Sequence, residues 1–366
     1  MAEDTAQLLA KGLQALAQRD HLNAFHYLQA ADWQRFGKPW NACNSEERVA
    51  FFESPQFPPE AVPLHKLQHD LEQIKYLRKN QKLPDEFQSV ENALEQVYAS
   101  LLQRFQNVSE TELLWLSPQE QELLAPFWNR NLYTEPLPES PEPLINPALD
   151  TDRVCWNYHH NQPGLAYCDQ ILAAPALTQI REFVLASTLW RDYQRGGYVG
   201  SYLPNGFCAP LLLQLADQVR AAFSPILQDL PLSLMWSYKY SQNSPGVGIH
   251  ADSGGRVNVN FWLTPDHANL EPEKGGLIVY DVMAPSDWDP RRYQLETLLK
   301  GKPCKAYPIP YRFNRALFFH SGLFHASDQL QFKPGYENRR INLTLLFGIR
   351  DADLESQSQY SWRPLI

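Results

Sequence analysis

The period of the hydrophobic pattern changes along this 366-residue chain, and that change restricts the possible folds more than any other feature. In the first third, apolar residues recur every three or four positions, as on one face of a helix. From residue 232 onward, short segments instead alternate apolar and polar residues, and stretches rich in Gly, Pro, Asp and Asn separate them. Helices followed by many short strands predict an α+β protein rather than a parallel α/β sheet.

The first third is expected to be helical throughout. The pattern between residues 8 and 33 predicts two short amphipathic helices that break near Asp20, and residues 64–78 and 88–108 predict two more. The first pair is similar to one tetratricopeptide-type hairpin, although no second copy follows at a period of about 34 residues. We therefore predict an all-α accessory domain over residues 1–130.

A stretch dense in Pro and acidic residues, TEPLPESPEPLINPA, follows this region and has no periodicity. Such a composition is typical of an extended linker or a strap across the surface. We place a Pro-rich linker at 131–150 and a second domain at 151–366. Helices are predicted at 171–193 and 209–227, ahead of the strands.

Six strand candidates occupy most of the last third of the chain. They are residues 232–241, 256–264, 275–281, 304–311, 315–321 and 339–349. Because no long helix is interleaved among them, we predict a double-stranded β-helix (jelly roll) with flanking helices. Residues 283–308 look like an insertion between strands that could shape a substrate entrance.

Charge and hydropathy argue against several classes of protein. The net charge of −9 disfavours a nucleic-acid or anionic-membrane binder, because such surfaces need clustered Lys and Arg. The acidic amphipathic start of the chain does not resemble a secretory signal, and no apolar run approaches the roughly 18 residues of a membrane span. We expect a cytoplasmic protein with no nucleic-acid or membrane partner.

The cysteines favour neither disulfides nor a thiolate zinc site. There are five of them, scattered along the chain and without a C-x-x-C pair: Cys43, Cys155, Cys168, Cys208 and Cys304. We expect buried free thiols. His65 and His69 lie four apart on a predicted helix, but no further ligand is nearby, so we assign them solvated or capping roles.

The tripeptide His250-Ala251-Asp252 stands where a strand pattern gives way to a turn. In extended backbone, residues two apart project to the same side, so the imidazole and the carboxylate converge. A second histidine would complete the facial triad that holds non-haem Fe(II) and leaves adjacent coordination positions open. His325, in SGLFHASD, is the candidate.

A 2-oxoglutarate co-substrate would chelate the iron through its keto acid and needs a cation for its distal carboxylate. The strand candidate at 339–349 begins with two arginines. Strand parity places Arg340 on a polar face with Asn342 and Thr344, and places Arg339 on the apolar face. The polar face is the one expected to line a pocket, which selects Arg340.

The same parity applies to the strand candidate at 256–264. Its alternate residues Asn258, Asn260 and Trp262 form a partly polar face. Asparagines in a barrel interior need partners. Either they bind a small polar ligand, or they satisfy one another and ordered water.

Residues 160–350 resemble the 2-oxoglutarate/Fe(II)-dependent dioxygenase superfamily, and in particular its prolyl-hydroxylase-like branch. In that branch a strand ending in Tyr precedes the H-x-D by about ten residues, and Tyr240 stands ten before His250. The resemblance implies that Tyr240 donates a hydrogen bond to the co-substrate, while a plain structural Tyr is the alternative.

The branch also has a Phe-Pro-Ser-like turn with its distal histidine four residues past the serine. FFHSGLFHAS matches through Ser321 and His325, although His320 replaces the proline and remains an alternative ligand. Arg340 follows His325 by 15 residues, in the position of the branch's basic residue, and residues 275–280 resemble the strand after the H-x-D.

The resemblance implies an oxygenase that uses Fe(II), O2 and 2-oxoglutarate, with ascorbate a further candidate cofactor. It would hydroxylate a peptide or protein side chain or a small molecule, releasing succinate and CO2, with no catalytic residue beyond the metal ligands. Asp252 argues against halogenation, since related halogenases vacate that ligand position. The helical domain could grip a polypeptide, cap the barrel or form a homodimer.

Two other classes of function stay open on the sequence. One is a non-enzymatic cupin-like binding module on a helical scaffold, in which the histidines are structural. The other is a 2-oxoglutarate-independent cupin-type metalloenzyme, which usually prefers three or four histidines. Serine-hydrolase and nucleotide-binding motifs are absent from the sequence.

Overall fold

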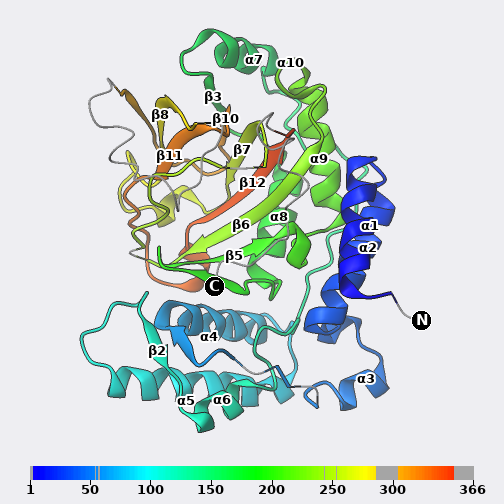
Figure 1. The fold of residues 1–366 in the computed structure, drawn as a ribbon, viewed down its shortest axis with the longest axis vertical. Helices are drawn as coiled ribbons and strands as arrows, with labels where there is room; N and C mark the ends of the chain where they lie inside the picture. Colours follow the sequence, from blue (N-terminus) through cyan, green and yellow to red (C-terminus); the bar gives the residue numbers. More distant parts are fainter. Residues whose placement is uncertain are drawn as a thin grey trace.

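A seven-stranded antiparallel sheet forms the centre of this computed structural model (Figure 1). The structure describes residues 3–53, 55–56, 58–242, 244–252, 254–285 and 304–349. In spatial order the strands are β3 (Leu165–Cys168), β10 (Ala316–His320), β7 (Val257–Trp262), β12 (Ile341–Phe347), β6 (Leu232–Tyr240), β5 (Tyr198–Tyr202) and β4 (Asp192–Gln194).

A smaller antiparallel sheet has three strands. They are β11 (Leu323–Ser327), β8 (Leu277–Met283) and β9 (Ala306–Ile309). The large antiparallel sheet with accompanying helices confirms the mixed class that the sequence predicted, whereas the jelly-roll arrangement stays a prediction. The predicted insertion, 283–308, lies largely outside the described residues.

Helices dominate the first part of the chain, and α8 (Ala174–Ala186) and α9 (Pro210–Ala222) cover the large sheet (Figure 1). The other α-helices are α1 (Thr5–Ala17), α2 (His21–Phe36), α3 (Ser45–Val49), α4 (Leu64–Lys79), α5 (Gln88–Arg104), α6 (Pro118–Leu124), α7 (Thr151–His160) and α10 (Ser224–Leu227). The predicted all-α character of the first third is not confirmed, because β1 (Ala61–Pro63) pairs with β2 (Leu113–Trp115).

Local signals set several helix boundaries close to where the sequence predicted them, but the helix predicted at 171–193 is wrong at its end, since α8 ends at Ala186 and Asp192–Gln194 form β4. The predicted break near Asp20 is confirmed, since its side chain caps α2 by accepting the Asn23 N–H at 3.2 Å. Pro84 lies between α4 and α5, where it prevents a continuous helix. The tetratricopeptide-like character of the α1–α2 hairpin stays a prediction.

The two faces of the large sheet differ in chemistry. Apolar side chains of β7 and β12, such as Val259, Phe261 and Leu343, join one hydrophobic cluster with residues of α8 and α9. The other face carries the polar side chains of the same strands, since neighbours in a strand point to opposite sides. The helix-covered face is therefore the core, and the polar face is free to build a site.

Residues 131–150 form a strap that packs on the helices. Leu137 and Leu144 are buried, and the backbone N–H groups of Ser140 and Leu144 donate to Gln214 and Gln218 of α9. One hydrophobic cluster includes residues from before and after this strap. The domain boundaries at 130 and 150 stay a prediction.

Three sequence predictions can be compared directly with the described residues. All five cysteines are free, but Cys304 is exposed rather than buried. His65 and His69 are buried, so the solvated or capping roles expected for them are wrong; Nδ1 of His65 contacts the Glu110 carbonyl instead. Within the described residues, no helix combines the length and apolar character that crossing a bilayer requires.

Candidate metal centre

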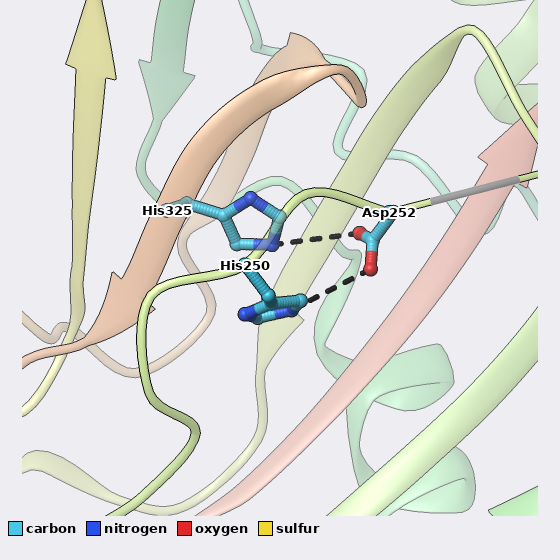
Figure 2. Close-up of side chains that lie close together, drawn as sticks. All are labelled: His250, Asp252 and His325. Carbon is cyan, nitrogen blue, oxygen red and sulfur yellow. Dashed lines mark ion pairs between the residues drawn. The ribbon is translucent and has the colours of Figure 1, made fainter. Parts of the chain in front are cut away.

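His250 and His325 are brought together by their own backbones. His325 lies within β11, and His250 follows β6 in a loop that forms a two-way bridge with it: each N–H donates to the other's carbonyl, at 2.9 and 2.8 Å. The two ring centroids lie 4.2 Å apart. Residues 75 positions apart in the sequence thus present their imidazoles side by side (Figure 2).

A backbone carbonyl orients each imidazole ring. Nδ1 of His250 lies 2.8 Å from the Gly248 carbonyl, and Nδ1 of His325 lies 2.9 Å from the Leu323 carbonyl. A carbonyl only accepts, so each Nδ1 carries the proton and, in the neutral ring, each Nε2 keeps a lone pair. This is the tautomer in which Nε2 can bind a metal ion.

Asp252 faces both Nε2 atoms (Figure 2). Its carboxylate oxygens lie 3.6 Å from Nε2 of His250 and 3.5 Å from Nε2 of His325. Burial alone would raise the pKa of Asp252, but the two imidazoles hold it well below its usual range. The carboxylate is therefore ionised, and Asn258 Nδ2 donates to its Oδ2 at 2.6 Å.

These three side chains fit a divalent metal ion. One ligand atom from each lies within 4.8 Å of the others. Among the described residues, they form the group of His, Cys, Asp or Glu side chains that is close enough together to hold a metal ion. Two imidazoles and one carboxylate are the donor set of non-haem Fe(II) sites with open coordination positions. The structure assembles the three predicted residues, and their role as metal ligands stays a prediction.

His320, the alternative ligand in the sequence, is not part of this group. Its Nδ1 accepts the Gly322 N–H at 3.1 Å. The neighbouring Phe319 packs its ring 4.8 Å from the His325 ring, and adjacent strand residues point to opposite faces. The parity of β10 thus directs Phe319, rather than His320, toward the site.

The polar face of the large sheet lies next to the three residues, since Asn258 of β7 donates to Asp252. Asn260 pairs with Thr344 across β7 and β12, and Asn342 pairs with Trp262. Both asparagine Nδ2 groups donate to Thr344 Oγ1, at 2.8 and 3.2 Å. The amide nitrogens are satisfied within the sheet, as one of the two sequence interpretations expected.

Other buried atoms on this face have no hydrogen-bond partner among the described residues. They are Oδ1 of Asn258, Asn260 and Asn342, Nε1 of Trp262, and Nη1 of Arg340. Buried polar atoms are nearly always paired, so a concentration of unpaired ones calls for an explanation such as a ligand or bound water. The second interpretation of the asparagines, contact with a polar ligand, therefore also keeps its support.

Arg340 is 1% exposed and lies on the same face. Its Nε and Nη2 donate to the carbonyls of Gly275 and Gly276, at 2.8 and 3.3 Å. Aromatic rings surround the guanidinium: its central carbon lies 4.7 Å from the Tyr240 ring and 5.8 Å from the Tyr311 ring. No carboxylate of the described residues forms an ion pair with it.

Residues that the sequence analysis did not single out hold Arg340 in place. Gly276 allows the close approach, because a Cβ there would come within 1.9 Å of the Ile309 carbonyl oxygen and 2.8 Å of the Trp262 ring. Tyr311 stacks on Trp262 with ring centroids 5.2 Å apart. The Gly-Gly pair at 275–276 was the available signal in the sequence, since adjacent glycines often mark a close backbone contact.

Tyr240 ends β6, as the sequence predicted, and is 2% exposed. Its ring faces Arg340, and its backbone N–H donates to the Arg340 carbonyl at 3.0 Å. Burial raises the pKa of the Tyr240 hydroxyl, although the nearby guanidinium opposes that shift. The hydroxyl is therefore protonated at neutral pH and able to donate a hydrogen bond.

Arg339 points the other way, as strand parity predicted. Its Nε donates to Glu72 Oε2 of α4 at 2.7 Å, on the helix side of the sheet. The two consecutive arginines thus have different environments: Arg339 has a carboxylate partner and Arg340 has backbone carbonyls and aromatic rings.

Comparison with known proteins gives a distant structural likeness and no sequence match. No protein-family model matches the chain, and no curated protein matches it. Similar solved structures include the non-heme alpha ketoglutarate dependent epimerase SnoN from nogalamycin biosynthesis, with 13% identity over 56% of this chain and 84% of that chain, at a TM-score of 0.42.

Two prolyl hydroxylases are also among the similar structures. The prolyl-4-hydroxylase of Pseudomonas putida is 14% identical over 55% of this chain and 99% of its own, with a TM-score of 0.38. The prolyl hydroxylase of Trichoplax adhaerens is 16% identical over 57% of this chain and 93% of its own, with a TM-score of 0.38. A likeness this distant assigns neither a reaction nor residue roles to this chain.

Proposed function

We propose that this protein is an Fe(II)- and 2-oxoglutarate-dependent oxygenase, with His250, Asp252 and His325 as metal ligands. The observation that carries the proposal is that His250, Asp252 and His325 form a three-ligand group beside the polar face of the large sheet, where Asn258 of β7 donates to Asp252. Arg340 lies on that face, buried and without a carboxylate partner among the described residues. A dicarboxylate bound at both places would satisfy each of them.

The side chains divide the work of binding between two ends of the co-substrate. Two neutral imidazoles and one ionised carboxylate would hold the metal, and Asn258 would keep Asp252 oriented. Arg340 would pair with the distal carboxylate, because a buried ion pair with a guanidinium is strong and directional. Tyr240 would donate its hydroxyl proton to an oxygen of the same ligand.

The bound metal would supply O2 activation coupled to conversion of 2-oxoglutarate into succinate and CO2. The chain's own contribution is positioning and exclusion of water. Trp262 and Tyr311 wall the Arg340 end with apolar rings, and a dry pocket strengthens each electrostatic contact. The substrate to be hydroxylated is a peptide or protein side chain or a small molecule.

Anaerobic titration tests this function. Fe(II) and then 2-oxoglutarate are added to the metal-free protein while the weak visible charge-transfer band of an Fe(II)–keto acid chelate is followed. We expect a band that needs both additions and disappears in His325→Ala. His267→Ala, which alters an exposed histidine outside the group, is the matched control and should keep the band.

Three results would reject the proposal in different ways. Metal binding without any effect of 2-oxoglutarate would favour the 2-oxoglutarate-independent metalloenzyme. Folded protein that binds neither would favour the cupin-like binding module. A band that survives His325→Ala would show that the ligand set is wrong.

A further inference from the structure

The link between the helical part of the chain and the site runs through Arg339. This arginine precedes Arg340, just before β12 begins at Ile341. Its side chain is only 6% exposed and reaches α4, which lies below the large sheet in Figure 1. There Glu72, at 25% exposure, is its carboxylate partner, with Nε and Oε2 2.7 Å apart.

The same guanidinium also contacts the strand that carries Tyr240. Arg339 Nη1 donates to the Tyr240 carbonyl at 3.5 Å, while the Tyr240 N–H donates to the Arg340 carbonyl at 3.0 Å. Arg339 therefore ties together the backbones of the two residues whose side chains face the proposed co-substrate. The Thr264 hydroxyl donates to the Arg339 carbonyl at 2.7 Å.

Glu72 is well placed to fix this arrangement. Gln68 Nε2 donates to its Oε1 at 2.9 Å, so both carboxylate oxygens are engaged and the side chain is oriented. A largely buried guanidinium that loses its carboxylate partner moves toward another partner or toward water. Such a movement of Arg339 would displace the backbone of Tyr240 and Arg340.

We propose that Glu72 is a positioning residue for 2-oxoglutarate binding and acts through Arg339 on Arg340 and Tyr240. This inference rests on the proposed function. It gives the helical part of the chain a role, because α4 sets the affinity of a ligand bound on the far face of the sheet. Outer contacts of this kind commonly change affinity by about 10-fold or more.

The test compares two ion pairs of α4. Glu72→Gln removes the charge that Arg339 needs. Glu91→Gln breaks the Arg78–Glu91 pair between α4 and α5, whose side chains are 21% and 15% exposed and which does not involve Arg339. Each Fe(II)-loaded variant is titrated anaerobically with 2-oxoglutarate, and Fe(II) affinity and melting temperature are measured separately.

We expect Glu72→Gln to raise the 2-oxoglutarate dissociation constant about 10-fold while Fe(II) affinity stays unchanged. Glu91→Gln should leave both constants at wild-type values. The double variant Glu72→Gln/Arg339→Gln replaces the ion pair by two amides, so its affinity should be no weaker than that of Glu72→Gln alone.

Two results would overturn the inference. One is a wild-type affinity in Glu72→Gln, and the other is an equal loss in Glu91→Gln, which would indicate general destabilisation. If the wild-type protein forms no Fe(II)–2-oxoglutarate band, the proposed function fails and this inference fails with it. The presence or absence of that wild-type band thus distinguishes the two failures.

Discussion

Arg191 and Arg340 are both buried arginines, and the structure surrounds them differently. Arg191 pairs with Asp32 at 2.9 Å, and its other N–H groups reach Asn131 and the carbonyls of Asn129 and Asn205. Arg340 has two carbonyls and a set of aromatic rings, with Nη1 unpaired and no carboxylate partner among the described residues.

The difference distinguishes an arginine that stabilises the fold from one that is available to bind a ligand. Burying a guanidinium costs roughly several kcal/mol of hydration free energy unless an anion and hydrogen bonds compensate. Around Arg191 the protein supplies that compensation itself. Around Arg340 it supplies only part, so an external anion would gain the remainder on binding.

The largest expected effect is on stability, from Arg191→Met. Removing the cation leaves Asp32 buried without its partner, so the free energy of unfolding should fall by about 3–5 kcal/mol. Arg340→Met should change it by less than about 1 kcal/mol, because no buried carboxylate is left behind. Urea unfolding of both variants gives the comparison, and equal losses would contradict it.

The second effect concerns affinity for 2-oxoglutarate. Here the substitution of Arg340 should have the large effect, and that of Arg191 should have none. Arg340→Met should raise the dissociation constant of 2-oxoglutarate about 100-fold, or about 2.7 kcal/mol, because the distal carboxylate loses its cation. Calorimetric titration of the metal-loaded, oxygen-free protein measures it. Arg191→Met, studied below its melting temperature, should bind normally; a change below about 3-fold in Arg340→Met would argue against the anion site.

A third experiment tests whether a dicarboxylate binds at Arg340 when no metal ion is present. Succinate at ten times its dissociation constant should stabilise the metal-free wild-type protein by about 1.4 kcal/mol, through binding to the folded state. Chemical unfolding with and without succinate measures this shift. Arg340→Met should show none, and an equal shift in both proteins would indicate binding elsewhere.

The smallest effect is expected at an exposed ion pair. Lys75 Nζ and Glu95 Oε1 lie 2.6 Å apart, and both side chains are 47% exposed. Water and salt screen such a pair, so Lys75→Gln should shift the melting midpoint by less than about 2 °C. A larger shift would mean that burial is not what distinguishes Arg191 from a surface cation.

Much of the site followed from local alternation in the sequence. The opposite directions of Arg339 and Arg340, and the shared face of Asn258, Asn260 and Trp262, needed only the period of a strand. Tyr240 lies at the predicted strand end. These features depend on neighbouring residues, which is why they could be predicted without the fold.

Other elements depended on partners distant in the sequence. β11, which carries His325, was not predicted as a strand, and it forms one by pairing with β8, 40 or more residues earlier in the sequence. β5 was not among the predicted strands, since Gly200 weakens its pattern, but pairing with β6 makes it a strand. The burial of His65 and His69 likewise depends on what packs against α4.

The sequence by itself determined the helix-to-strand order, the parity of the polar faces and the His250–Asp252 pair of candidate ligands, because each is set by residues a few positions apart. Only the tertiary structure decided that His325 rather than His320 joins His250, through a backbone bridge between segments 75 residues apart. Only the tertiary structure revealed that Arg339 pairs with Glu72 and that Arg340 donates to a glycine carbonyl. Long-range contacts of this kind depend on how the strands and helices pack, and that packing is a property of the whole chain.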